Sequence, residues 1–150
     1  RDTFVIKTGG KRNVGNIVAR VKFVSEPIIY IRNYEESSRA TFSKIEKSIN
    51  IVLGLERLFT FLSSVREFYT LIITIQSFLG EKRRKAFYLI NKEIASSIPL
   101  NPLPELERVA STVIETVPTP TSGIFTFKKS TSLDLLGKRI EIPIGVIGWK

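Results

Sequence analysis

The chain has 150 residues, with 23 Lys and Arg against 14 Asp and Glu, a formal net charge of +9, and no His, Cys or Met. Without His and Cys it has no side chain that ordinarily titrates near neutral pH, no thiolate nucleophile and no soft metal ligand. Most catalytic and metal-centre chemistry is thereby disfavoured, and we predict a protein that is not an enzyme and needs no cofactor.

The length and the balance of apolar and charged residues predict one domain over residues 1–150. Because the chain contains no Met, we expect Arg1 to lie inside a longer precursor. The most apolar stretch, residues 49–79, contains four charged side chains and is too polar for a membrane span. The absence of a disulfide framework favours an intracellular location, in the cytoplasm, the nucleus or a virion.

The N-terminal residues alternate between apolar and polar side chains, which is typical of strands. Gly9, Gly10 and Asn13 supply a first connection, and Pro27 opens a third strand after a short turn. We expect an antiparallel meander of three strands, whose inward residues are Phe4 and Ile6, then Ile17, Ala19, Val21 and Phe23, then Ile29 and Ile31.

The middle of the chain has a helical period. Ser37 or Ser38 is a plausible N-cap for a first helix. Across residues 49–79, polar side chains recur every three or four positions, which predicts one long amphipathic helix that Gly80 ends. A third helix is expected from Glu81 to Ile98 and a fourth across residues 106–117, after a connector rich in proline.

Alternation returns after Pro118 and Pro120, and it predicts two more strands, one with Phe125 and Phe127 and one with Ile140, Ile142, Ile144 and Val146. Strands, then helices, then strands indicate the α+β class. We predict one antiparallel sheet of three N-terminal and two C-terminal strands, packed against about four central helices.

The solvent face of this predicted sheet is basic. Cations that neutralise phosphates, together with an aromatic ring on which a base can stack, suit single-stranded nucleic acid. The alternative is an ordinary wet sheet face, on which Lys and Arg are common. The residues assigned to this face are Lys7, Arg20, Lys22, Tyr30, Arg32, Lys128 and Arg139.

A second basic cluster, Lys82, Arg83, Arg84 and Lys85, falls at the expected start of the third helix. Cations in a first helical turn oppose the helix dipole, so a phosphate-rich partner would explain them, whereas the alternative is a solvated charge run. Lys11 and Arg12 follow the glycines of this loop and are further candidates for phosphate contact. The loop is not a Walker A sequence, and a hairpin tip is its simpler role.

Two functions remain open. The first is a sequence-tolerant nucleic-acid-binding protein, with single strands favoured and no small-molecule substrate evident. The second is a self-assembling structural protein, matrix-like or coat-like, in which the long helix forms a subunit interface and the basic surface binds anionic lipid or a genome.

Overall fold

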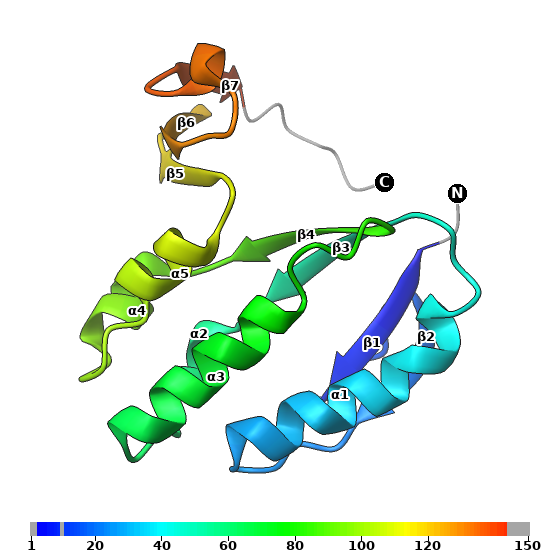
Figure 1. Cartoon of the computed structure of the whole chain (residues 1–150). Helices are drawn as coiled ribbons and strands as arrows, with labels where there is room; N and C mark the ends of the chain where they lie inside the picture. The colour runs from blue at the N-terminus through cyan, green and yellow to red at the C-terminus, as the bar shows by residue number, and fades with distance from the viewer. Residues whose placement is uncertain (1–2, 10, 144–150) are drawn as a thin grey trace. The chain divides into compact units, whose positions relative to one another are not determined.

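The computed structural model describes residues 3–9 and 11–143 (Figure 1). Within them the chain forms five α-helices, one 3-10 helix and seven strands, so the prediction of mixed helices and strands is confirmed. The chain divides into two compact units, Arg1–Leu103 and Pro104–Lys150. The strands form three separate sheets instead of one: β1 with β2, β3 with β4, and β5 with β6 and β7.

In the first unit, β1 (Phe4–Thr8) and β2 (Asn16–Val21) pair in parallel, and α1 (Pro27–Phe42) packs on β2. Two predictions are wrong here. The first pair is not antiparallel, and residues 29–31 belong to α1 instead of a third strand. Pro27 opens this helix, because its fixed φ and missing N–H suit the first helical position as well as they suit a strand start.

The predicted long helix over residues 49–79 is also wrong. It is divided into β3 (Ser48–Leu53), the short α2 (Glu56–Phe59) and α3 (Val65–Ser77). Gly54 ends the strand with a positive φ of 76°, a backbone conformation that residues other than glycine rarely adopt. The polar stripe over the last part of the segment is confirmed, since Thr70, Thr74 and Ser77 lie on α3 and bond to carbonyls one turn back.

The third and fourth predicted helices are wrong in the same way. Residues 81–98 form β4 (Arg84–Leu89) and α4 (Lys92–Ser97), which Asn91 caps by accepting a hydrogen bond from the Ile94 N–H. Residues 106–117 are divided between α5 (Leu103–Val109) and β5 (Val113–Pro118). Both strands arise where an alternating pattern competes with a helical one over a short window.

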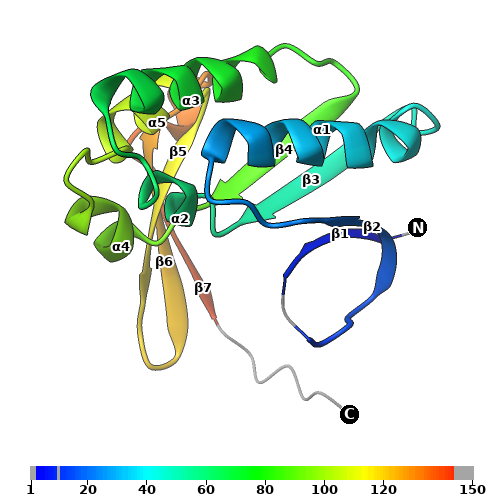
Figure 2. The same cartoon turned by 90° about the horizontal axis from the view of Figure 1, so that it is seen from below.

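β3 and β4 pair in parallel, and the connection through α2 and α3 forms the crossover that parallel strands require. Figures 1 and 2 show α1 and α3 side by side over one face of this pair. Asn50 on that face donates a hydrogen bond to the Tyr34 hydroxyl of α1 at 3.4 Å. This places the α1–α3 layer against the Ser48, Asn50 and Val52 side of β3.

The core of the first unit gathers around α2 and α3. Leu71 and Ile72 of α3 are fully buried, and the rings of Phe59 and Phe68 lie 5.7 Å apart. Burying these side chains removes apolar surface from water, which is the main stabilising contribution to the fold. The other buried core residues of this unit are Val21, Ile31, Leu55, Leu58, Ile75, Ala95 and Ile98.

In the second unit, β5, β6 (Ser122–Lys129) and β7 (Arg139–Pro143) form an antiparallel meander, with the 3-10 helix Leu133–Leu135 in the last connection. The predicted strands at Phe125, Phe127, Ile140 and Ile142 are confirmed, whereas Ile144 and Val146 lie outside the described residues. Lys129 anchors the end of α5 by donating to the Glu107 and Arg108 carbonyls. No helix in residues 3–9 and 11–143 is long and apolar enough to cross a membrane.

Candidate functional site

The parallel pair β1–β2 brings two cations together. Lys7 and Arg20 occupy paired positions of the register, so their side chains lie next to each other on the same sheet face. Lys11 and Arg12 follow in the exposed connection between the two strands. We call Lys7, Lys11, Arg12 and Arg20 the β1–β2 basic cluster.

The cations of this cluster donate hydrogen bonds to neutral acceptors. The Lys7 ammonium donates to the Arg12 carbonyl and to Asn13 Oδ1 at 3.2 Å, and the Arg20 guanidinium donates to the same Asn13 oxygen at 2.9 Å. In the described part of the chain, neither Lys7 nor Arg20 forms an ion pair with a carboxylate. Two adjacent cations therefore share one neutral acceptor, and the cluster keeps an uncompensated positive charge.

The cluster faces away from α1. Thr8, one position beyond Lys7, points to the opposite sheet face, where its hydroxyl lies 2.5 Å from the Tyr30 hydroxyl of α1. Figure 2 shows the connection between β1 and β2 looping away from α1. Lys11, Arg12 and Arg20 are exposed, and Lys7 is half-buried.

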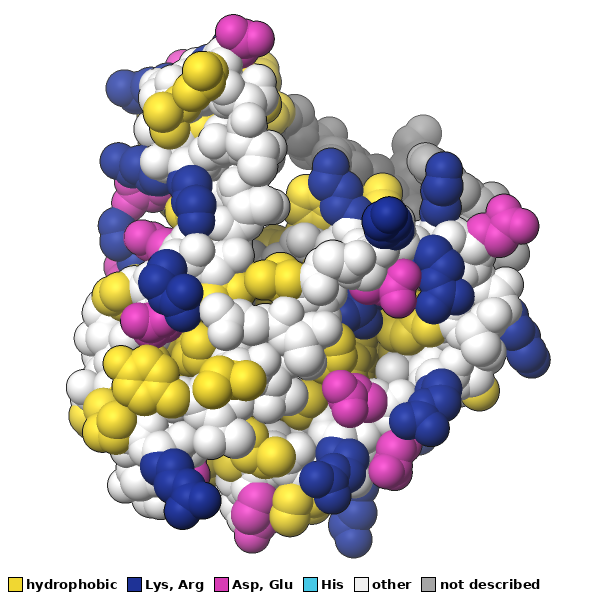
Figure 3. Space-filling model, in the orientation of Figure 1, with side chains coloured by type: hydrophobic (Ala, Val, Ile, Leu, Met, Phe, Trp, Pro, Cys, Tyr) yellow, Lys and Arg dark blue, Asp and Glu magenta, His cyan; other side chains and the backbone are white. Residues whose placement is uncertain are grey.

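The predicted seven-residue basic face does not exist as one surface of one sheet. Lys22 directly follows β2, and Tyr30 and Arg32 lie on α1. Tyr30 contacts Thr8 on the face opposite Lys7, so it is not interleaved with the cations. Lys128 and Arg139 belong to the other unit, on β6 and β7, and Lys128 forms an ion pair with Glu115 at 3.3 Å. On the face shown in Figure 3, basic side chains are scattered among acidic ones.

The second predicted cluster is also dispersed, because residues 84 and 85 belong to a strand instead of a helix start. Arg84 and Lys85 therefore point to opposite faces of β4. Lys82 is exposed in the preceding turn. Arg83 pairs with Glu81 through two side-chain contacts at 3.1 and 3.3 Å. The dipole argument for a phosphate partner at this position does not hold, since no helix begins there.

The turn before β4 contains an internal charge pair. The hydrogen bonds from the Arg83 side chain and backbone N–H lower the pKa of Glu81 below its ordinary value, and the same pairing raises the pKa of Arg83. Both groups are therefore charged at neutral pH and largely neutralise each other.

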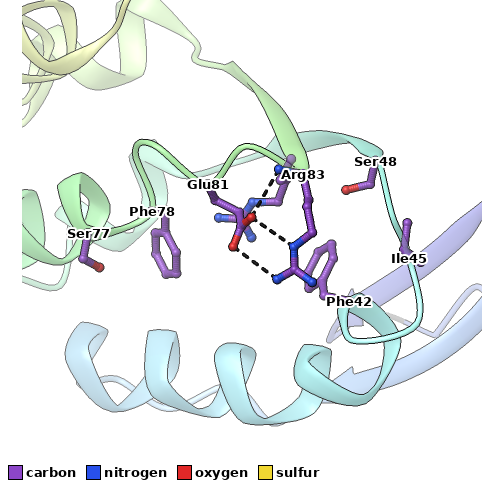
Figure 4. A pocket seen from close by; sticks show the side chains of 8 residues that line it. Phe42, Ile45, Ser48, Ser77, Phe78, Glu81 and Arg83 are labelled. Carbon is purple, nitrogen blue, oxygen red and sulfur yellow. Dashed lines mark hydrogen bonds and ion pairs between the residues drawn. The ribbon is translucent and has the colours of Figure 1, made fainter.

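The sequence analysis named Arg84 as a basic residue but missed its contact with two aromatic rings. Its guanidinium lies 5.3 Å from the ring centroid of Phe42, at the end of α1, and 5.0 Å from that of Phe78, at the end of α3. Close contacts of this kind are cation–π interactions. A pocket of about 180 Å³ opens beside them (Figure 4). No local sequence signal joins these three residues, because they come from three separate elements.

Glu56 is a second buried group that the sequence did not reveal. It opens α2, only 5% of it is exposed, and its Oε2 atom has no hydrogen-bond partner among the described residues. No group of three or more His, Cys, Asp or Glu that could hold a metal ion occurs in residues 3–9 and 11–143.

A solved structure of another protein has a fold similar to that of this chain. A structure described as "Structural study of Project ID PH0250 from Pyrococcus horikoshii OT3" superimposes with a TM-score of 0.73 and 26% sequence identity over 93% of this chain. This chain spans only 64% of the length of that structure. No curated protein matches the sequence. Residues 1–141 match the family described as "Pyrococcus protein of unknown function, DUF257", and the chain belongs to this family.

Proposed function

We propose that the chain is a non-catalytic nucleic-acid-binding protein that neutralises phosphates with the β1–β2 basic cluster. The pairing of Lys7 with Arg20 supports this proposal most directly, because two like charges lie side by side and neither pairs with a carboxylate of residues 3–9 and 11–143. Like charges directly opposite each other on neighbouring strands destabilise the pair, and a bound phosphate would relieve that repulsion.

The chemistry of the cluster suits a ligand of repeated phosphates. Lys and Arg contact phosphate oxygens whatever the base, so such binding tolerates many sequences. The exposed connection with Lys11 and Arg12 adds two cations close to the strand pair. The argument for base stacking on Tyr30 falls away, because Tyr30 lies on α1 and contacts the sheet face opposite Lys7. The cluster therefore supports contact with the phosphate backbone without base stacking.

Fluorescence anisotropy with labelled single-stranded RNA, single-stranded DNA and duplex DNA tests this proposal. Lys7→Gln with Arg20→Gln should weaken binding of the preferred nucleic acid by at least about tenfold, since charged contacts contribute roughly 1.5–3 kcal/mol. The matched control is Lys44→Gln with Lys47→Gln, which removes the same charge from the exposed segment between α1 and β3. Equal weakening in both double variants would show that net charge alone matters.

Anionic vesicles form the comparison arm, because a basic surface also attracts lipid headgroups. Preferential binding of vesicles would contradict a nucleic-acid partner. Absence of binding to every nucleic acid at low salt would contradict it as well.

Self-assembly is the second candidate, and its surface is not the predicted long helix. One face of the β3–β4 pair carries large apolar side chains that remain exposed: Ile49, Ile51, Leu53, Phe87 and Leu89. Parallel strands are ordinarily covered on both faces. A second copy seated on this face would bury it. Light scattering across a range of concentrations tests this candidate, and Ile51→Lys should abolish any association that the wild type shows.

A further inference from the structure

Arg84 is held in an unusual environment at the start of β4. Its guanidinium lies within 5.3 Å of two ring centroids, those of Phe42 and Phe78, and the side chain is half-buried. An Arg in contact with two rings has lost much of its rotational freedom, so its planar head is positioned before any ligand arrives.

The N–H groups of this head are not used by the protein. Within the described residues, the Arg84 side chain forms no hydrogen bond and no ion pair. Its neighbour Arg83, in contrast, donates hydrogen bonds to both oxygens of the Glu81 carboxylate. A guanidinium carries five N–H donors in a fork that matches a carboxylate or a phosphate. The two aromatic rings stabilise the positive charge of Arg84 but carry no oxygen that could accept a hydrogen bond from these donors.

A pocket adjoins Arg84. It has a volume of about 180 Å³, its apolar lining comes from Phe42, Ile45 and Phe78, and its polar lining includes Ser48 and Ser77 (Figure 4). Apolar cavities of about 150 Å³ bind benzene in another protein. The volume therefore suits a ligand with about one ring, and the lining suits an apolar body with one polar head.

The net charge of the pocket lining determines whether the polar head of the ligand should be anionic, neutral or cationic. Glu81 is the one acidic residue in the lining of this pocket, against Arg83 and Arg84; it bonds directly to Arg83 and also interacts electrostatically with Arg84. Arg84 then leaves one net positive charge on the pocket wall. A neutral ligand would leave this charge unpaired, and a cation would be repelled.

We propose that this pocket binds a small organic anion, a carboxylate or a phosphate monoester on a compact apolar body. The oxyanion accepts hydrogen bonds from the Arg84 guanidinium, and the apolar body packs against Phe42, Ile45 and Phe78. This site is separate from the β1–β2 basic cluster, and it adds a small-molecule ligand to a chain in which none was expected.

The test is a titration of the full chain, labelled with ¹⁵N, followed by the ¹H–¹⁵N resonances of the Arg side chains and the backbone. The probes are benzoate and phenyl phosphate, with benzamide as the neutral analogue of benzoate and inorganic phosphate as the anion without an apolar body. We expect benzoate or phenyl phosphate to shift the Arg84 Nε–H together with backbone amides around residues 77–84, and benzamide to leave them in place.

Arg84→Lys keeps the charge and removes the fork, and it should weaken binding of the anion by roughly ten- to a hundredfold. Arg66→Lys is the matched control on the exposed first turn of α3 and should bind as the wild type does. If Arg84→Lys does not fold, the Arg84 Nε–H shift in the wild type still decides the question.

Four results would overturn the proposal. The first is no shift with either organic anion, and the second is an equal response to benzamide. The third is undiminished binding by a folded Arg84→Lys variant. The fourth is inorganic phosphate that binds as tightly as phenyl phosphate, which would refute recognition of the apolar body.

Discussion

Glu56 illustrates how one side chain can work against the fold around it. A buried carboxylate oxygen without a hydrogen bond costs the free energy of desolvation, and the position of Glu56 in the first turn of α2 offsets only about 0.3–1 kcal/mol of that cost. No periodicity in the sequence could show this burial, because a glutamate is ordinarily exposed. The burial follows from the packing of α2 in the core.

Replacing this carboxylate should therefore stabilise the protein. We predict that Glu56→Met, which keeps the length of the side chain, raises the free energy of unfolding by about 1–3 kcal/mol. Urea denaturation followed by circular dichroism measures the change. Glu46→Met, at an exposed position after α1, should change it by less than about 0.5 kcal/mol. A less stable Glu56→Met variant would mean that the carboxylate has a stabilising partner.

At the scale of elements, the N-terminus of α3 depends on a reciprocal cap. Ser64 Oγ accepts a hydrogen bond from the Glu67 N–H, and the Glu67 carboxylate accepts bonds from the Ser63 N–H and hydroxyl at 2.8 and 2.9 Å. These bonds from Ser63 lower the pKa of Glu67 below its ordinary value of 4.5. They favour the charged carboxylate in the folded state.

A depressed pKa in the folded state gives a definite pH dependence. The stabilisation by Glu67 is fully present above its unfolded pKa and is lost as the pH falls through its lower folded pKa. We predict that Glu67→Gln reduces the loss of stability between about pH 6 and pH 3, and that Ser63→Ala has a smaller effect of the same sign. Urea midpoints across this range measure it. An unchanged acid-induced loss in Glu67→Gln would contradict the role of the cap.

The segment with β3 shows why several elements could not be assigned from the sequence. Ile49, Ile51 and Leu53 fit a strand by alternation, yet they also extend the apolar face of the helix that follows. The helix over residues 65–77 was predicted from the polar stripe of Thr70, Thr74 and Ser77. In the structure its buried face consists of Phe68, Leu71, Ile72 and Ile75. The short strands β3, β4 and β5 were not predicted, because each adjoins a helix of similar composition.

The two interpretations of this segment predict opposite effects of substitution. In the structure, 64% of Ile51 is exposed, whereas Leu71 is fully buried. We predict that Ile51→Lys changes the free energy of unfolding by less than about 1 kcal/mol, and that Leu71→Ala lowers it by about 2–5 kcal/mol. Urea denaturation of both variants under the same conditions tests this. A large loss in Ile51→Lys would place Ile51 in a covered interface.

At the scale of the whole molecule, the sequence predicted the mixture of helices and strands and the excess of positive charge. It did not predict which cations share a surface, because that depends on strand pairing. Lys7 and Arg20 were assigned to one face and do lie side by side, but through a parallel pair instead of a meander. Tyr30 was assigned to the same face and lies on the opposite one, since Pro27 begins a helix.

The two compact units also divide the predicted basic surface. Lys128 and Arg139 belong to the second unit, and Lys128 has its own carboxylate partner in Glu115. The uncompensated charge that supports the proposed function is thus local to β1–β2 and does not depend on the second unit. The prediction of a single domain over the whole chain stays a prediction.

The salt dependence of nucleic-acid binding tests the central claim most directly. Each neutralised phosphate contributes about −0.7 for a single strand, or about −0.9 for duplex DNA, to the slope of log K against log salt concentration. If Lys7 and Arg20 each contact a phosphate, Lys7→Gln with Arg20→Gln should flatten the slope by roughly 1.4 for a single strand. The control variant Lys44→Gln with Lys47→Gln should have the same slope as the wild type. A slope that stays unchanged when Lys7 and Arg20 are replaced would contradict the account.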